Sequence, residues 1–129
     1  MELTREHIEA VSKLSSEERY SYTIKRIADW EVMYTLSNAQ DEIVWSELEG
    51  NLMVPFWTAP EFAEKCISSG WGNTQVKMIT LDDFEQEIVD FLAEREYLLN
   101  IFPVGDKTGF VVDLLEFSRD LAAELENYS

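Results

Sequence analysis

The first part of the chain carries apolar residues at helical spacing. Thr4 can cap a first helix, because a threonine hydroxyl accepts a hydrogen bond from a backbone N–H of the first turn. Ser15 and Glu18 have the spacing of a capping box, which predicts the start of a second helix. The residues that recur on one face are Ile8, Val11 and Leu14, then Tyr20, Ile24 and Ile27. We therefore expect two short helices within residues 1–28.

From Trp30 onward the apolar residues alternate with polar ones, which is typical of strands. The apolar members of the first expected strand are Val32, Tyr34 and Leu36. A second strand containing Ile43 and Trp45 follows a polar turn, and a third covers residues 52–54 and ends at Pro55. This pattern predicts an antiparallel meander in which Trp30 and Trp45 face the core.

The middle of the chain predicts two further helices separated by a strand. Thr58 and Glu61 again have capping-box spacing, with Pro60 in the first turn of the helix. The expected buried face of this helix consists of Phe62, Ala63, Cys66 and Ile67. Trp71 is expected to re-enter the core before a strand at residues 75–79, and Thr80 then caps a helix. The apolar stripe of that helix consists of Leu81, Phe84, Ile88, Phe91 and Leu92.

The last third reads as a hairpin followed by a helix. Residues 97–102 and 110–112 are apolar runs joined by a loop from Gly105 to Gly109, and Asp113 can cap the final helix. The expected fold is therefore a single α+β domain over residues 1–129. It has a mainly antiparallel sheet of five or six short strands, with helices at the N-terminus (1–28), between strands and at the C-terminus. Residues 29–129 would form its core.

The net charge of the chain limits the kinds of molecule that we expect it to bind. The chain has 26 acidic and 10 basic residues and a net charge of −16, so it repels the phosphates of nucleic acids and anionic membrane surfaces. A basic protein is the partner that such a surface would attract. No apolar run approaches the length needed to cross a bilayer, no leader precedes the first helix, and Cys66 is the single cysteine. We expect a cytoplasmic protein that binds neither nucleic acid nor membrane.

Several segments together resemble a known bacterial family. They are residues 54–63, which read Val-Pro-Phe-Trp-Thr-Ala-Pro-Glu-Phe-Ala, then Gly70 and Trp71, then residues 79–84, which read Ile-Thr-Leu-Asp-Asp-Phe. This order is similar to the uncharacterised family called domain of unknown function 2750, over roughly residues 24–127. The resemblance implies a bacterial, cytosolic, single-domain protein, and it brings no activity, cofactor or catalytic residue.

The residues present no catalytic constellation. Cys66 lies late in its helix, the adjacent Lys65 is expected on a different side of that helix, and the lone His7 is far away in sequence, so we expect a buried thiol and no nucleophile. One histidine and one cysteine cannot make a zinc site, and the glycine clusters match no phosphate-binding loop. The acids Asp82, Asp83, Glu85 and Glu87 are expected on a solvated helix start. We expect no metal, no cofactor and no enzymatic activity.

Two functional hypotheses remain, together with self-association. The first is a non-enzymatic protein-interaction, accessory or regulatory domain, in its sharper form an antidote whose carboxylates meet a basic target. The alternative is a small-ligand-binding domain with an aromatic pocket around Trp57 and Trp71. The candidate ligand or partner surface consists of Phe56, Trp57, Phe62 and Trp71. Self-association would form a homodimer through an exposed apolar patch or an edge strand near residues 110–112.

Overall fold

The computed structural model describes residues 4–105 and 107–128. Its helices are α1 (Arg5–Ser12), α2 (Ser16–Trp30), α3 (Pro60–Gly70), α4 (Leu81–Asp83), α5 (Val89–Arg95) and α6 (Leu114–Leu125). A π-helical segment, η1 (Phe84–Ile88), joins α4 to α5, and a 3-10 turn, η2 (Glu126–Tyr128), follows α6. The strands are β1 (Val32–Ser37), β2 (Ser46–Leu48), β3 (Asn51–Phe56), β4 (Gln75–Thr80), β5 (Leu98–Ile101) and β6 (Phe110–Val112). The α+β class expected from the sequence is confirmed.

Four of the helix starts expected from the sequence form as expected. Thr4, Ser15, Thr80 and Asp113 each accept a backbone N–H of their first turn through the side chain. Ser15 and Glu18 complete a reciprocal capping box. These interactions connect residues three positions apart, so local sequence is enough to specify them.

The start of α3 differs from expectation. Ala59, rather than Thr58, is the residue before the helix, and no side chain caps it. Pro60 occupies the first turn as expected, where a missing N–H costs nothing. The Thr58 hydroxyl is buried and has no hydrogen-bond partner within residues 4–105 and 107–128. The helix therefore begins one residue later than the capping-box spacing predicts.

The expected meander is wrong, because the first strands do not pair in chain order. β1 pairs antiparallel with β4, while the other sheet has the order β2-β3-β5-β6. β2 and β3 form a hairpin, as do β5 and β6, but β3 and β5 are parallel, with Met53 opposite Leu98. β3 also continues through Pro55 to Phe56 rather than ending at Pro55. Both sheets together remain mainly antiparallel.

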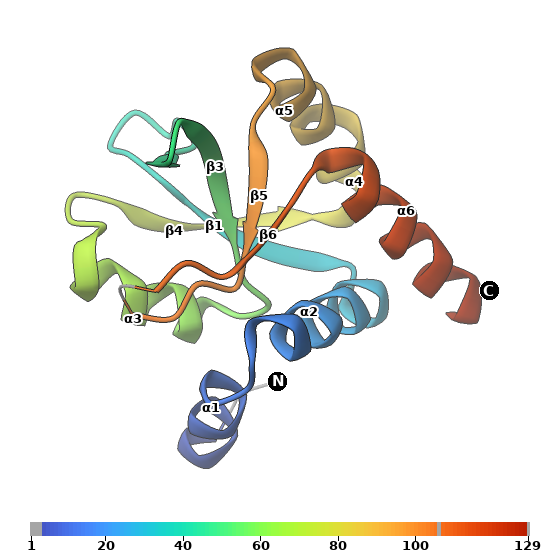
Figure 1. Cartoon of the computed structure of the whole chain (residues 1–129), viewed down its shortest axis with the longest axis horizontal. Coiled ribbons are helices and arrows are strands. Elements are labelled where there is room, and N and C mark those ends of the chain that lie inside the picture. Colours follow the sequence, from blue (N-terminus) through green and yellow to red (C-terminus); the bar gives the residue numbers. More distant parts are fainter. Residues whose placement is uncertain (1–3, 106, 129) are drawn as a thin grey trace.

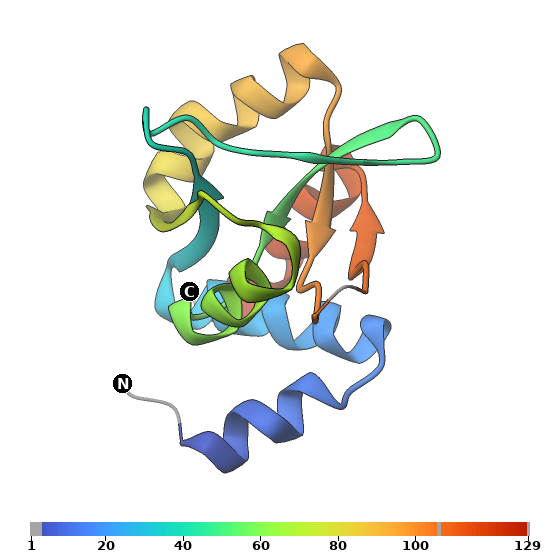
Figure 2. The ribbon, with the colours of Figure 1, turned by 90° about the vertical axis from the view of Figure 1, so that its left-hand side faces the viewer.

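The two sheets meet at one bridge. Tyr34 of β1 and Trp57, just after β3, exchange two backbone hydrogen bonds of 2.9 and 2.8 Å. Helices α2 and α6 pack together against β5, and α3 packs against β1 and β4 (Figure 1). In the perpendicular view α3 lies in front of the four-stranded sheet and α6 behind it (Figure 2).

One core connects these layers. Phe84 of η1 packs edge-on against both Phe56 of β3 and Phe117 of α6, with ring centroids 6.0 and 5.6 Å apart. The apolar stripe expected after Thr80 is therefore continuous through the π-helical segment, in which Phe84 and Ile88 are both buried. Among the described residues, no helix is long and apolar enough to cross a membrane.

Candidate binding site

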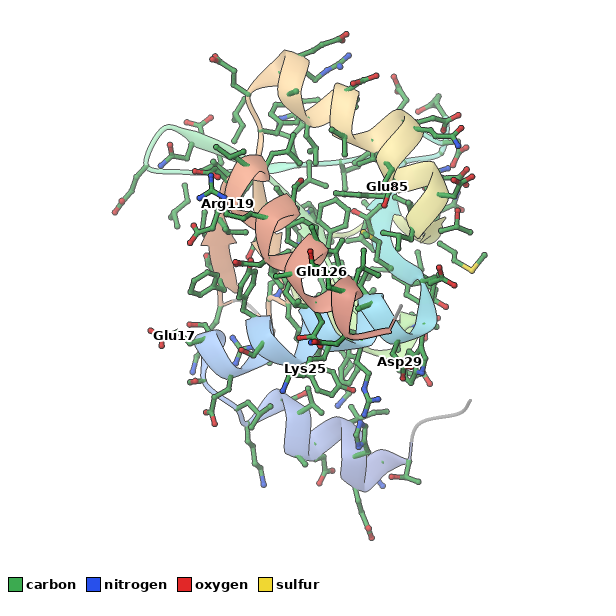
Figure 3. The ribbon with its side chains drawn as sticks, turned by 90° about the vertical axis from the view of Figure 1, so that its right-hand side faces the viewer. Glu17, Lys25, Asp29, Glu85, Arg119 and Glu126 are labelled. Atoms are coloured by element: carbon green, nitrogen blue, oxygen red, sulfur yellow. The ribbon has the colours of Figure 1, made fainter. Side chains whose placement is uncertain are left out.

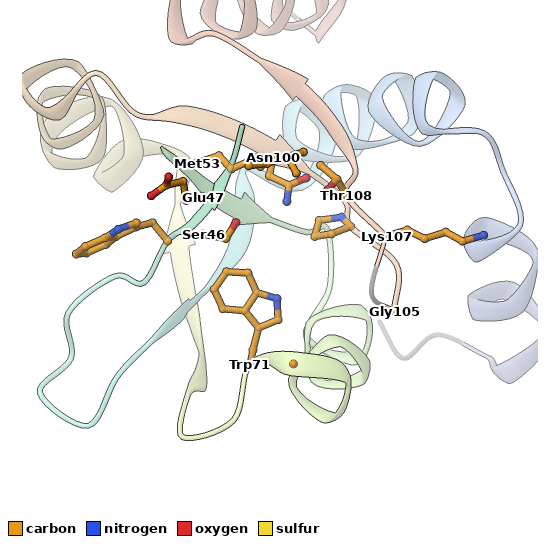
Figure 4. A pocket seen from close by; sticks show the side chains of 12 residues that line it. Ser46, Glu47, Met53, Trp71, Asn100, Gly105, Lys107 and Thr108 are labelled. Carbon is orange, nitrogen blue, oxygen red and sulfur yellow. The ribbon is translucent and has the colours of Figure 1, made fainter. Parts of the chain in front are cut away.

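A pocket of about 460 Å³ lies against one face of the four-stranded sheet (Figure 4). Met53 of β3 and Asn100 of β5 form its floor, and Trp71, which follows α3, forms one wall. Because side chains alternate along a strand, Asn100 points away from Leu99 and Ile101, which are buried on the opposite face. The pocket therefore occupies the sheet face that α6 does not cover. We call it the Trp71 pocket.

Asn100 is a buried polar side chain in an otherwise apolar strand. It is 4% exposed, and its Oδ1 accepts the Gly109 backbone N–H at 2.7 Å. A backbone N–H can only donate, so the atom that faces Gly109 is the amide oxygen, and the Nδ2 group faces the pocket. In Figure 4 the nitrogen points toward the side where Trp71 stands. No acceptor within the described ranges, 4–105 and 107–128, takes its hydrogens.

Gly109 makes this arrangement possible. A Cβ atom at this position would lie 2.1 Å from the Ile101 carbonyl oxygen, far inside van der Waals contact. Only a residue without a side chain lets the returning strand approach β5 so closely. The close approach brings the Gly109 N–H to Asn100, which in turn orients the amide.

Three of the four aromatic residues expected at a ligand or partner surface are buried. Trp71 is half-buried and lines the pocket, but Phe56 and Trp57 are 0% exposed and belong to the core. Phe62 is buried as well and borders a second hollow of about 360 Å³ beside Cys66. Of the expected set, Trp71 is therefore the one accessible to a ligand in the Trp71 pocket.

Trp57 does not line the pocket but holds Pro103, which does. Its indole N–H donates to the Pro103 carbonyl at 2.9 Å, and the Cys66 thiol donates to the same oxygen at 3.2 Å. The Pro103 ring lines the Trp71 pocket, so these two buried groups position one of its walls. Burial raises the pKa of the Cys66 thiol and so favours its protonated form at neutral pH, and the buried position expected for Cys66 is confirmed.

Arg19 holds the residue next to this wall. Its Nε donates to the Phe102 carbonyl at 3.0 Å, and its guanidinium also donates to the Leu14 carbonyl. Phe102 has a φ of 60°, a conformation that is costly for a residue with a side chain. Burial lowers the pKa of Arg19, although the group stays charged over the physiological range. The buried cation therefore stabilises a strained turn that leads into the pocket wall.

The expectation that Trp45 faces the core is wrong. The residues between Ser37 and Ser46 are irregular apart from a single bridge at Ile43, so the alternation assumed from the sequence does not reach Trp45. Trp45 is 49% exposed, at the rim of the pocket, with its ring 5.4 Å from that of Tyr97. Trp30, also expected in the core, is half-buried beneath the Arg26 guanidinium.

Sequence reasoning missed Asn100 as a site residue, although a signal was present. Asn100 is the polar residue in the apolar run of residues 97–102, and a buried amide needs hydrogen-bond partners. Its presence in a buried strand therefore indicates a specific structural or functional role. Ser46 and Thr108, which also line the pocket, carried no comparable signal. The acids of α4 and η1 are exposed as expected, and the described residues include no cluster of three or more potential metal ligands.

Comparison with known proteins gives a family but no function. A family model described as "Protein of unknown function (DUF2750)" matches residues 20–121. This range includes the whole pocket floor, Trp71 and Arg119 of α6, and it excludes α1. No curated protein matches the chain.

Proposed function

The chain belongs to the DUF2750 family, whose description assigns no function, and from its geometry we propose that it is a non-enzymatic protein-interaction domain. Its partner docks on the face around the Trp71 pocket. The chain then acts as an accessory or regulatory protein, and an antidote that covers a basic target is one form of this role.

The observation that carries the proposal is the exposed apolar rim of the pocket. Trp45 and Leu48 are 49% and 46% exposed, and both line the pocket that Trp71 closes on the other side. Tryptophan is enriched among the residues that dominate the energy of protein interfaces. Large apolar side chains next to a directed hydrogen-bond donor give a partner both contact area and orientation.

Charge supports a basic partner. The chain has 26 acidic and 10 basic residues, yet three ion pairs join described residues to one another: Arg5–Glu9, Arg26–Asp29 and Lys77–Asp41. Exposed acids such as Glu17 of α2 and Glu85 of η1 point outward from different elements (Figure 3). A basic surface would relieve their mutual repulsion and would be drawn in by the field.

The lining of the pocket supports binding rather than catalysis. Glu47 and Lys107 are its charged members among the described residues, and both are exposed. A carboxylate that acts as a general acid near neutral pH needs a raised pKa, which usually requires burial or a nearby like charge. The Cys66 thiol is directed at the Pro103 carbonyl and does not line this pocket.

The proposal is tested by capturing partners with the wild-type protein and with a Leu48→Glu variant. We expect a stoichiometric basic partner that the variant binds at least about tenfold more weakly, because an interface anchor contributes on the order of 1–2 kcal/mol. Leu115→Glu is the matched control, since Leu115 is 68% exposed on α6 and does not line the pocket. A partner retained equally by both variants would contradict the proposal, as would the recovery of no stoichiometric partner at either low or moderate salt.

A small-ligand-binding domain is the second candidate, favoured by the volume of about 460 Å³ beside a half-buried tryptophan. Small-molecule sites in proteins occupy roughly 300–1,000 Å³. A screen for ligands that change tryptophan fluorescence in the wild type but not in Trp71→Leu would identify it. Light scattering of the purified chain separates both candidates from self-association, since a dimer would have twice the mass of 15.0 kDa.

A further inference from the structure

The floor of the Trp71 pocket cannot accept an added strand. Met53 lies on β3, which is paired with β2 on one side and β5 on the other. Asn100 lies on β5, which is paired with β3 and β6. The backbone groups of both strands are already used in the sheet, so an occupant of the floor must be recognised through side chains.

The Asn100 amide requires an acceptor from that occupant. Its Nδ2 is directed into the pocket, its oxygen is held by Gly109, and the residue is 4% exposed. Nδ2 is open to the pocket, so an occupant that covered it without offering an acceptor would leave a buried donor unsatisfied, whereas an occupant with a carbonyl there would not. An anionic acceptor is disfavoured, because Glu47 lines the pocket and the chain carries a charge of −16. Lys107, the cationic member of the lining, extends away from the pocket (Figure 4).

The wall of the pocket suits a flat apolar group. The Trp71 ring stands in the pocket and makes no ring or cation contact with another described residue (Figure 4). Pro103 and Met53 supply further apolar surface, and the exposed rings and side chains of Trp45 and Leu48 continue it outward. The pocket therefore combines an aromatic and aliphatic wall with polar side chains, among which the Asn100 amide is held in one orientation.

Among the ways in which proteins recognise peptides, these features select one. Strand addition is excluded at the floor by the paired strands, and a strand added at the outer edge of β2 would be separated from Asn100 by β2 and β3. Recognition of phosphorylated segments would need a cluster of arginines that the described lining lacks. An amphipathic helix needs a groove that accepts anchors over two turns, whereas the apolar wall of this pocket is centred on the single ring of Trp71. Polyproline II segments dock on aromatic grooves, and their carbonyls are free because the conformation has no internal hydrogen bonds.

We propose that the Trp71 pocket binds an extended, proline-containing segment of the partner in the polyproline II conformation. A prolyl ring packs on Trp71, and a main-chain carbonyl of the segment accepts a hydrogen bond from Asn100 Nδ2. A basic residue beside the proline faces Glu47. The inference rests on the proposed protein-interaction function and specifies the part of the partner that enters the pocket.

The test uses a capped proline-rich peptide with a lysine at each end, titrated into the full-length protein and followed by tryptophan fluorescence and calorimetry. Asn100→Asp keeps an oxygen that can accept the Gly109 N–H and removes the amide NH2 group that would donate to the peptide, so we expect at least roughly tenfold weaker binding. Trp71→Leu should weaken binding to a similar degree and serves as the second variant if Asn100→Asp is poorly folded. Leu115→Glu is the control and should bind as the wild type does.

Three results with the peptides would overturn the inference. They are no binding of the peptide to the wild type, equal binding of a peptide with alanine in place of proline, and equal binding by Trp71→Leu. A neutral oligosaccharide that binds with the same dependence on Trp71 would also overturn it and would assign the pocket to a sugar. If partner capture is lost in Leu48→Glu while the proline peptide does not bind, the interaction function stands and the inference about the segment fails.

Discussion

Replacement of Arg19 by methionine tests how the pocket wall is held. Arg19 is 7% exposed, and its donors satisfy the carbonyls of Phe102 and Leu14. Methionine retains most of the apolar stem and removes both donors. The Phe102 carbonyl would then be buried without its partner, in a residue whose φ of 60° is already unfavourable.

The size of the effect follows from two opposing contributions. A hydrogen bond from a charged group stabilises a protein by about 1.5–3 kcal/mol, so two such bonds contribute roughly 3–6 kcal/mol. The burial that lowers the pKa of Arg19 shows that placing the charge there has a cost, which methionine removes. We expect a net loss of about 2–4 kcal/mol in the free energy of unfolding.

Urea unfolding followed by tryptophan fluorescence measures this loss, with the slope of the transition checked for a change in the denatured state. Arg26→Met is the matched control. The Arg26 side chain is 36% exposed, lies over the Trp30 ring and is 4.0 Å from Asp29, so its loss should cost about 1 kcal/mol or less. Equal stability of the two variants would refute the argument that the two carbonyl bonds hold this turn.

Two further predictions concern Tyr20 and Gly109. Burial, together with the Asp120 carboxylate that accepts the Tyr20 hydroxyl at 2.6 Å, raises the pKa of Tyr20 above its ordinary value. The folded state therefore keeps a proton that the unfolded state releases, so the stability advantage of the wild type over Tyr20→Phe should be complete below about pH 10 and fall at higher pH. A pH-independent difference in unfolding free energy would contradict this. Gly109→Ala should lower the free energy of unfolding by about 1–3 kcal/mol, because the added methyl group overlaps the Ile101 carbonyl, and should shift the Asn100 side-chain amide resonance. Gly72→Ala is the control, since no atom lies within 4 Å of its added Cβ, and its stability should change little. Equal losses of stability in the two variants would contradict the predicted clash.

The features predicted correctly from the sequence are those set by neighbouring residues. The caps at Thr4, Ser15, Thr80 and Asp113 depend on residues three positions away. The hairpin of β5 and β6 also joins segments that are close in the chain, with Leu99 opposite Val112. Local chemistry therefore fixes element type and most helix starts.

The features that were missed depend on partners far along the chain. Alternation in β1 shows which residues share a face, but it does not show that β4 rather than β2 is the neighbour. The prediction for Trp45 is wrong because alternation shows which face a residue occupies only while the strand continues, and the chain is irregular before Ser46.

The candidate site shows the same limit. The sequence places Trp57 and Trp71 on either side of one predicted helix, and Trp71 does line a pocket. Trp57, expected in a loop beside that helix, is buried, and the Pro103 carbonyl accepts its indole N–H. The Asn100 amide is oriented only by the Gly109 N–H, and the hairpin of β5 and β6 brings this N–H next to it. Sequence spacing carries no information on which ring or amide meets an open space.

The parallel pairing of β3 with β5 has a consequence for how the chain is made. Met53 finds Leu98 only after α3, β4 and the helices that follow have been synthesised, so the central sheet cannot assemble on a ribosome until the last third of the chain has emerged. Until then the edge of β3 that pairs with β5, residues 53–56, has no partner. Truncation before β5 should therefore yield an aggregating fragment rather than a smaller folded domain.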